Sequence, residues 1–223
     1  MRKDTFNFRI TKDLKTIGKF DMPVINSFDF NNLRCKYLLV TPFNYALTEI
    51  EPESKICHFY LDDYQFERVW KEPETYVEIL KKFNAVIGAD FSMYENLPLP
   101  QQMYNNWRNK VLMAYWQQQG VRVIPNVQWS NERSFDFSFD GYSPGGTVAI
   151  SSTGCQFKKA KENFIKGYHK MCEVLKPDKV ILIGKLHEKL KADEKIINIP
   201  SFMEERRKLW AEEEAVSNQK ITQ

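Results

Sequence analysis

Residues 86–94, VIGADFSMY, decide the fold because an apolar strand runs directly into a carboxylate, a hydroxyl and a phenol. The apolar run begins at Ala85 and shows no alternation of polar and apolar positions. An unbroken apolar run of this kind is typical of a strand covered on both faces, as in a parallel sheet. The strand then ends at Asp90 and Ser92, so we expect its carboxyl end to border a polar site.

Short apolar runs of similar character are expected to be strands at residues 37–41, 56–61, 121–127, 147–151, 180–183 and 195–199. Apolar positions with helical spacing, bounded by proline or glycine, predict helices at residues 73–83, 100–119 and 157–175. Strands that alternate with helices predict a parallel α/β fold. Because 223 residues are fewer than the roughly 250 of a complete eightfold barrel, we expect a compact or incomplete (β/α) barrel-like sheet. An open doubly wound sheet is the alternative.

The chain divides into three parts. Residues 1–35 lack clear periodicity and are expected to form an extension or cap, residues 36–200 the α/β core, and residues 201–223 a charged C-terminal helix (202–215) and tail. Within the core, residues 134–146, SFDFSFDGYSPGG, alternate phenylalanine with aspartate or serine before two turn signals. That alternation predicts a short amphipathic strand or one arm of a hairpin.

The composition is ordinary for a soluble globular protein, with 43% hydrophobic and 27% charged residues. A net charge of +3 permits a nucleic-acid ligand but lies far below that of a protein that coats DNA. The four cysteines form no C-x-x-C pair, which argues against a zinc ribbon or thioredoxin motif, and no apolar run has the length of a membrane span. We therefore expect a cytoplasmic protein with reduced thiols and no membrane association.

Groups that ionise or form hydrogen bonds follow five successive strands of the expected sheet. They are Asp62 and Asp63, then Asp90 and Ser92, then Asn126, Gln128 and Trp129, then Ser151, Ser152 and Thr153, and finally Lys185. The carboxyl ends of parallel strands lie at one edge of a sheet, so we expect these side chains to surround one ligand pocket. For any single residue, the alternative is a helix cap or an ordinary loop position.

A pair of carboxyl groups is the expected reactive centre. Asp62 and Asp63 are adjacent on an extended segment, so only one of them can face the pocket beside Asp90. Two neighbouring carboxyl groups acquire different pKa values and can act as acid, base or nucleophile, with Asp90 in the main role. The alternative is a structural ion pair between one carboxylate and Arg68 or Arg108.

Amide and aromatic side chains near the strand ends are expected to bind the substrate ring. Asn126 and Gln128 would form hydrogen bonds with ring edges. Trp129 and Tyr142 follow polar strand ends and would stack on a base or sugar ring.

Two turns are expected to approach the ligand. The turn at residues 151–154, SSTG, precedes a helix and, together with Lys185, would hold an anionic group. Gly145 and Gly146 would let a ligand come close to the backbone, with a plain turn as the alternative.

The sequence requires no cofactor. His58, His169 and His187 are widely spaced and form no ligand cluster, so we expect no metal site built on histidine. The aspartates leave Mg²⁺ compatible with the pocket. We expect the partner to be a small molecule or a component of a nucleic acid.

Four segments together resemble an uncharacterised protein family: GADFSMY (88–94), GVRVIPNVQWS (120–130), SFDFSFDGYSPGGTVAISSTG (134–154) and KPDKVILIG (176–184). That family is known only as a domain of unknown function in bacteria, phages and mobile elements. The resemblance covers about residues 36–190 and implies a prophage or mobile-element setting, but no particular activity.

A weaker likeness points to the barrels of tRNA-guanine transglycosylases. The order of Asp62, Asp90, NVQW (126–129) and GYSPGGTVAIS (141–151) is similar to the order of motifs in that family. The family's DSGGFQ motif and zinc cysteines are missing, and Lys185 stands where its aspartate nucleophile would follow the strand. The likeness implies a barrel that holds a flat ring, without implying base exchange.

These observations support three hypotheses of different classes. The first is an enzyme that acts on a nucleobase, nucleoside or sugar-like substrate through aspartate-based acid–base or nucleophilic chemistry. The second is a non-catalytic accessory protein that binds a nucleotide or nucleic acid in the same pocket. The third is a protein–protein adaptor that uses the charged C-terminal helix.

Overall fold

A computed structural model describes residues 4, 6–35, 37–155 and 157–201, and the helix expected at 202–215 lies outside them. Strands form at all seven expected places, most of them shorter than the apolar runs. Four belong to one parallel sheet: β3 (Leu39–Pro42), β4 (Lys55–His58), β5 (Ala85–Ile87) and β6 (Val123–Ile124). Three belong to a second: β7 (Thr147–Ser151), β8 (Lys179–Ile183) and β9 (Ile196–Ile199).

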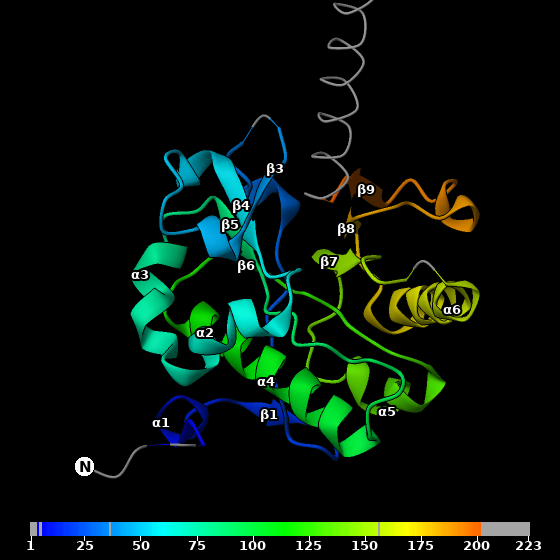
Figure 1. Cartoon of the computed structure of the whole chain (residues 1–223), viewed down its shortest axis with the longest axis horizontal. Coiled ribbons are helices and arrows are strands. Elements are labelled where there is room, and N and C mark those ends of the chain that lie inside the picture. Colours follow the sequence, from blue (N-terminus) through cyan, green and yellow to red (C-terminus); the bar gives the residue numbers. More distant parts are fainter. Residues whose placement is uncertain (1–3, 5, 36, 156, 202–223) are drawn as a thin grey trace, which may run out of the picture.

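The two sheets continue into one another beyond the end of β6. Asn126 forms a parallel bridge with Ala149 of β7, and the Val127 N–H donates to the Ala149 carbonyl at 2.9 Å. The strands therefore follow chain order from β3 to β9, without the reversal that defines a doubly wound sheet. The parallel α/β prediction is confirmed, and the described residues form a curved, barrel-like row that does not close (Figure 1).

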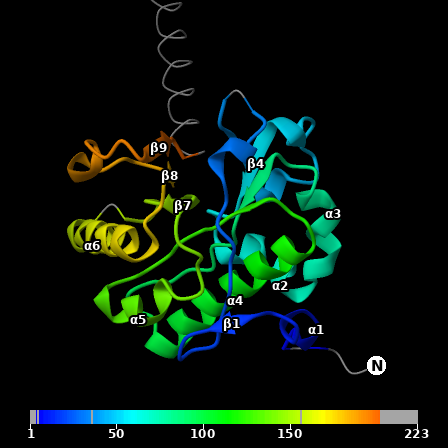
Figure 2. The same cartoon turned by 180° about the vertical axis from the view of Figure 1, so that it is seen from behind.

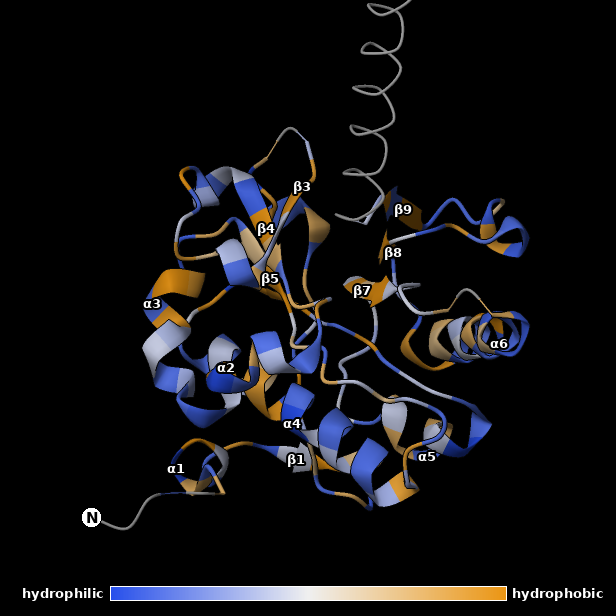
Figure 3. Ribbon diagram, viewed as in Figure 1, coloured by the Kyte–Doolittle hydropathy of each residue, from blue (hydrophilic) through white to orange (hydrophobic). Residues whose placement is uncertain are grey.

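Both faces of this row are buried, which explains the unbroken apolar runs. Ala85 and Ile87 of β5 belong to an inner cluster with residues of the other strands, whereas Val86 packs in the larger cluster that includes the helices. Phe28, from the N-terminal segment, joins the inner cluster, and its carbonyl accepts the Thr147 N–H at 2.7 Å. In Figure 3, β5, β8 and β9 are coloured mainly as hydrophobic, whereas α4 is coloured largely as hydrophilic.

The helices lie along the outer side of the strands, and α1 and β1 lie beneath α4 (Figures 1 and 2). The short elements of the N-terminal segment are α1 (Phe8–Thr11), β1 (Thr16–Ile17) and β2 (Met22–Pro23). The remaining helices are α2 (Glu67–Lys71), α3 (Val77–Leu80), α4 (Leu99–Gln118), α5 (Phe135–Ser138) and α6 (Lys158–Leu175). Short 3₁₀ turns are Phe30–Asn32, Phe43–Tyr45, Pro52–Ser54, Asp63–Gln65, Pro73–Tyr76, Glu132–Ser134 and Glu188–Leu190.

The two long helices have clear end signals. A proline lies in the first turn of α4, where no backbone N–H is needed, and Gly120 follows its end with a φ of +83°. Lys176, with a φ of 48°, ends α6, and Pro177 prevents its continuation. No helix of the described ranges is long and apolar enough to cross a membrane.

The prediction of a strand or hairpin arm at residues 134–146 is wrong. The segment begins with the 3₁₀ turn Glu132–Ser134 and continues as α5, so Phe135, Phe137 and Phe139 lie on a short helix and its end. Within the described residues, the strand-type pairing of this segment is limited to an isolated bridge between Tyr142 and Ile25, and Phe137 packs against Phe20 edge to face. An alternating pattern over six residues does not distinguish a strand from a single helical turn when the aromatic rings find partners on several sides.

Candidate functional site

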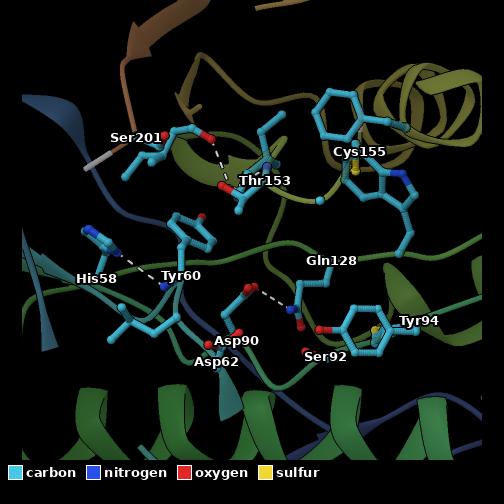
Figure 4. A pocket seen from close by; sticks show the side chains of 18 of the residues that line it. His58, Tyr60, Asp62, Asp90, Ser92, Tyr94, Gln128, Thr153, Cys155 and Ser201 are labelled. Carbon is cyan, nitrogen blue, oxygen red and sulfur yellow. Dashed lines mark hydrogen bonds between the residues drawn. The ribbon is translucent and has the colours of Figure 1, made fainter. Parts of the chain in front are cut away.

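One pocket of about 810 Å³ lies at the carboxyl ends of the parallel strands (Figure 4). Every one of the seven strands, or the loop that follows it, contributes to the lining: Pro42, His58, Asp90, Gln128, Ser151, Ile183 and Ser201. Its volume is in the range of pockets that hold small molecules, roughly 300–1,000 Å³. The lining also contains apolar side chains, including Leu61, Val127, Ile150 and Phe164.

Asp90 is held in this pocket by two amide side chains. Asn126 Nδ2 donates to Asp90 Oδ1 at 2.8 Å, and Gln128 Nε2 donates to the same oxygen. The other carboxyl oxygen, Oδ2, has no hydrogen bond within the described part of the chain. Because Oδ1 already accepts two N–H groups, a proton on Asp90 belongs on Oδ2.

Both amides are themselves oriented by further donors. Tyr60 Oη donates to Asn126 Oδ1 at 3.0 Å, and the second Asn126 N–H reaches the Ala89 carbonyl at 2.8 Å. Asn109 of α4 donates to Gln128 Oε1. The hydrogen-bonding groups of Asn126 and Gln128, which were expected to contact ring edges, are thus engaged with Asp90 and its surroundings.

Amide side chains on the buried side of α4 form hydrogen bonds with the loop that contains Asp90. Four amide residues recur with spacings of three, four and seven on this face: Gln102, Asn105, Asn106 and Asn109. Asn105 donates to the Ser92 carbonyl at 2.6 Å, and Asn109 accepts the Phe91 N–H at 2.9 Å. They hold the loop that contains Asp90.

Burial raises the pKa of the Asp90 carboxyl to about 7. The negative charge of Asp63 acts in the same direction, whereas the hydrogen bonds from Asn126 and Gln128 oppose the rise. A carboxyl group with a pKa near neutrality exchanges its proton readily at physiological pH, which is the property required of a general acid or base.

The two candidate partners of Asp90 have separate positions. Asp62 is exposed and lines the pocket. Asp63 points elsewhere, since it accepts the Ser92 hydroxyl at 2.8 Å and the Ser92 N–H at 3.1 Å. Arg108 Nη2 lies 4.0 Å from the same carboxylate, so Asp63 takes part in the structural ion pair that was the alternative. Ser92 itself lines the pocket.

The two aromatic candidates also differ in position. Trp129 lines the pocket, but its indole packs between Phe139 and Phe164 and donates to the Asn163 carbonyl at 3.3 Å. Gly167 of α6 makes room for this ring, because a Cβ there would lie 2.0 Å from Trp129 Nε1. Tyr142 is buried outside the lining, and its hydroxyl donates to the Asn126 carbonyl at 2.6 Å.

Only part of the expected anion-binding turn reaches the pocket. Ser151 and Thr153 line it, whereas Ser152 is buried and donates to the Lys185 carbonyl at 2.9 Å. The exposed Lys185 is outside the lining.

Gly145 and Gly146 lie at the opposite, amino end of β7, where the Gly146 N–H donates to Asp178 at 2.9 Å. The expected approach of a ligand to this glycine pair is therefore wrong for this pocket, and the turn interpretation holds.

Two lining residues of β4 and the loop after it, His58 and Tyr60, were missed as site candidates. His58 Nδ1 accepts the Tyr60 N–H at 3.2 Å, and its Nε2 has no partner among the residues that the structure describes. Cys155 also lines the pocket, but burial and the charge of Asp90 raise its thiol pKa to about 11, which disfavours a thiolate nucleophile. Within the described ranges, no group of three histidine, cysteine or acidic residues is placed to hold a metal ion.

Comparison with known proteins yields one family and two phage relatives. A family model described as a domain of unknown function (DUF4417) matches residues 16–202. The Gene 1 protein of Mycobacterium phage L5 is 37% identical over 153 residues, which cover 68% of this chain and 67% of that protein. The Gene 1 protein of Mycobacterium phage D29 is 34% identical over 164 residues, which cover 70% of this chain and 60% of that protein. No solved structure matches the chain.

Proposed function

The chain belongs to this family of unknown function, which confirms the resemblance seen in its motifs, and we propose that it is an enzyme of acid–base chemistry. Its substrate is a nucleobase, a nucleoside or a sugar-like ring bound at the carboxyl ends of the strands. Asp90 is the acid and base, and Oδ2 is the atom that gives and takes the proton. Asn126 and Gln128 position the carboxyl group and do not contact the ring.

One observation carries this proposal: the two amides occupy Asp90 Oδ1 and leave Oδ2 as the site of the exchangeable proton. The raised pKa of Asp90 supports the same role. The surrounding aliphatic and aromatic side chains give a flat ring apolar contacts on its faces. The phage origin of the relatives is compatible with a nucleic-acid component as substrate.

The test is a turnover screen of wild type against Asp90→Asn. Purified protein is incubated with pooled nucleosides, free bases and sugars, and the products are identified by mass spectrometry. We expect wild type to convert one class and Asp90→Asn to be at least about 100-fold slower, because general acid–base catalysis typically contributes that much. Asp136→Asn, which changes an exposed carboxylate on α5, serves as the control.

Two outcomes contradict the proposal. Conversion at the wild-type rate by Asp90→Asn removes Asp90 from the mechanism. Recovery of a bound ligand unchanged, over long incubation, supports the alternative of a binding protein without chemistry.

A further inference from the structure

The charges on the pocket wall restrict the ligand. Asp62, Asp90 and Glu95 are all part of the lining, whereas the described lining residues include no lysine or arginine. The charge of Glu95 is matched from outside by Lys159, which is largely exposed and is itself outside the lining. A phosphate group in the pocket would therefore face the carboxyl groups of Asp62 and Asp90, which no lysine or arginine of the described lining offsets, and like charges at short range oppose binding.

His58 provides a hydrogen-bond donor in the same pocket. The side chain is 2% exposed and lines the pocket. Its Nδ1 accepts the Tyr60 N–H, so the neutral ring carries its proton on Nε2. Burial lowers the pKa of His58 to about 4, and the ring is accordingly neutral at physiological pH.

The Nε2–H of His58 is a buried donor that lacks an acceptor within the described structure. Such donors are rare because burial removes their bonds to water without replacement. A carbonyl oxygen or ring nitrogen of a bound ligand would supply the missing acceptor, and both groups are common on nucleobases.

On the premise of the proposed function, we infer that the pocket takes an unphosphorylated nucleobase or nucleoside that accepts a hydrogen bond from His58 Nε2. Asp90 then lies beside the reacting edge of the ring. Nucleotides and sugar phosphates are excluded as substrates, and sugars without a base are disfavoured. A single ligand thus satisfies the buried donor and avoids the carboxylates.

The experiment is calorimetric titration of wild type, His58→Asn and His58→Gln. The probes are the four ribonucleosides, their free bases and their 5′-monophosphates. An asparagine amide reaches the position of Nδ1 only, whereas a glutamine amide reaches that of Nε2, so the two variants separate the two nitrogens. His169→Asn, on the exposed side of α6, is the control for substitution of a histidine elsewhere.

We expect a base or nucleoside to bind wild type and its monophosphate to bind at least about tenfold more weakly. His58→Asn should weaken the bound ligand about tenfold, as loss of one buried hydrogen bond does, while His58→Gln stays within about threefold of wild type. Unfolding temperatures of all variants show whether they are folded.

A monophosphate that binds as tightly as its nucleoside overturns the inference, as does wild-type affinity in folded His58→Asn. If only sugars or phosphorylated ligands bind, and Asp90→Asn abolishes their turnover, the inference fails and the proposed function survives. If no member of the panel binds and none is converted, both fail.

Discussion

Asp90 and Lys110 are two buried ionisable side chains whose pKa values both lie at about 7, reached from opposite directions. Asp90 has one oxygen bound by two amides and the other at the pocket. Lys110 is 0% exposed, and its Nζ donates to the Phe137 carbonyl at 2.7 Å, 5.0 Å from the centre of the Tyr142 ring. Burial is the main cause of both shifts, and of the two residues Asp90 lines the pocket at the carboxyl ends of the strands.

The difference teaches that a perturbed pKa identifies burial before it identifies function. Lys110 connects α4 to α5, where the backbone would otherwise lack a donor, and its surroundings leave no room for a ligand. The pKa of Asp90 is shifted by a similar amount, but its Oδ2 accepts no hydrogen bond from the described residues. Access to a ligand, added to the shift, separates a candidate acid from a structural ammonium group.

A large loss of stability is expected in Lys110→Ala. Removing the long side chain leaves a cavity and an unpaired carbonyl at Phe137, so we expect the free energy of unfolding to fall by about 3 kcal/mol. Urea denaturation measures the change. Lys110→Met, which keeps the volume, should lose less, and unchanged stability in Lys110→Ala would show that the ammonium group has no structural role.

Asp90→Asn should have the opposite effect on stability at high pH. The folded pKa of about 7 lies above the unfolded value of 3.8, so wild type loses stability as pH rises from about 4 to 7, and the variant does not. We expect Asp90→Asn to be more stable than wild type by about 4 kcal/mol at pH 8 and equally stable below about pH 4. Thermal unfolding at both pH values tests this, and a variant less stable at pH 8 contradicts the assigned pKa.

The pH dependence caused by Lys110 should have the reverse sign. Its folded pKa of about 7 lies below the ordinary lysine value of 10.5, so its contribution makes wild type more stable as pH rises from 7 to 10. Asp140 is the charged group that opposes the shift. We expect Lys110→Met to lack about 3 kcal/mol of this rise. Parallel slopes for the two proteins in chemical denaturation over this range would refute the shift.

The smallest expected effect is a difference between the variants of two tyrosines, both of which donate a hydrogen bond to Asn126. Tyr60 bonds to the amide that holds Asp90, whereas Tyr142 bonds to the backbone carbonyl. Tyr60→Phe and Tyr142→Phe should each cost about 1 kcal/mol of stability. Only Tyr60→Phe should raise the pKa of Asp90 further, because it loosens an amide that stabilises the carboxylate. Carbon-detected NMR titration of the Asp90 carboxyl measures this, and equal shifts in both variants would contradict it.

The strands were predictable because a strand that is buried on both faces is an unbroken apolar run in the sequence. Residues 147–151 agree residue for residue with β7, and the other runs differ only at their ends. The segment at 134–146 was not predictable in this way. Its alternation satisfies a strand and a helical turn equally, and the choice is made by distant partners such as Phe20.

The position of the pocket could be predicted from the sequence, whereas the roles of the residues around it could not. Asp90 follows directly from a strand end, but the use of Asn126 and Gln128 depends on donors 19 or more residues away, such as Tyr60 and Asn109. One available signal was overlooked. The amide residues of α4 recur with helical spacing, and that periodicity in polar residues predicts a buried hydrogen-bonding face as well as an apolar stripe predicts a core.

The agreement between strand order and chain order has a consequence for how the protein folds. Each strand of the row after β3 pairs with the strand that precedes it in the chain, so the walls of the pocket can be added in sequence order. Asp90 and the side chains that orient it, from Tyr60 to Gln128, all precede β7. During synthesis from the amino end, the surroundings of the acid can therefore form before the remaining strands have left the ribosome.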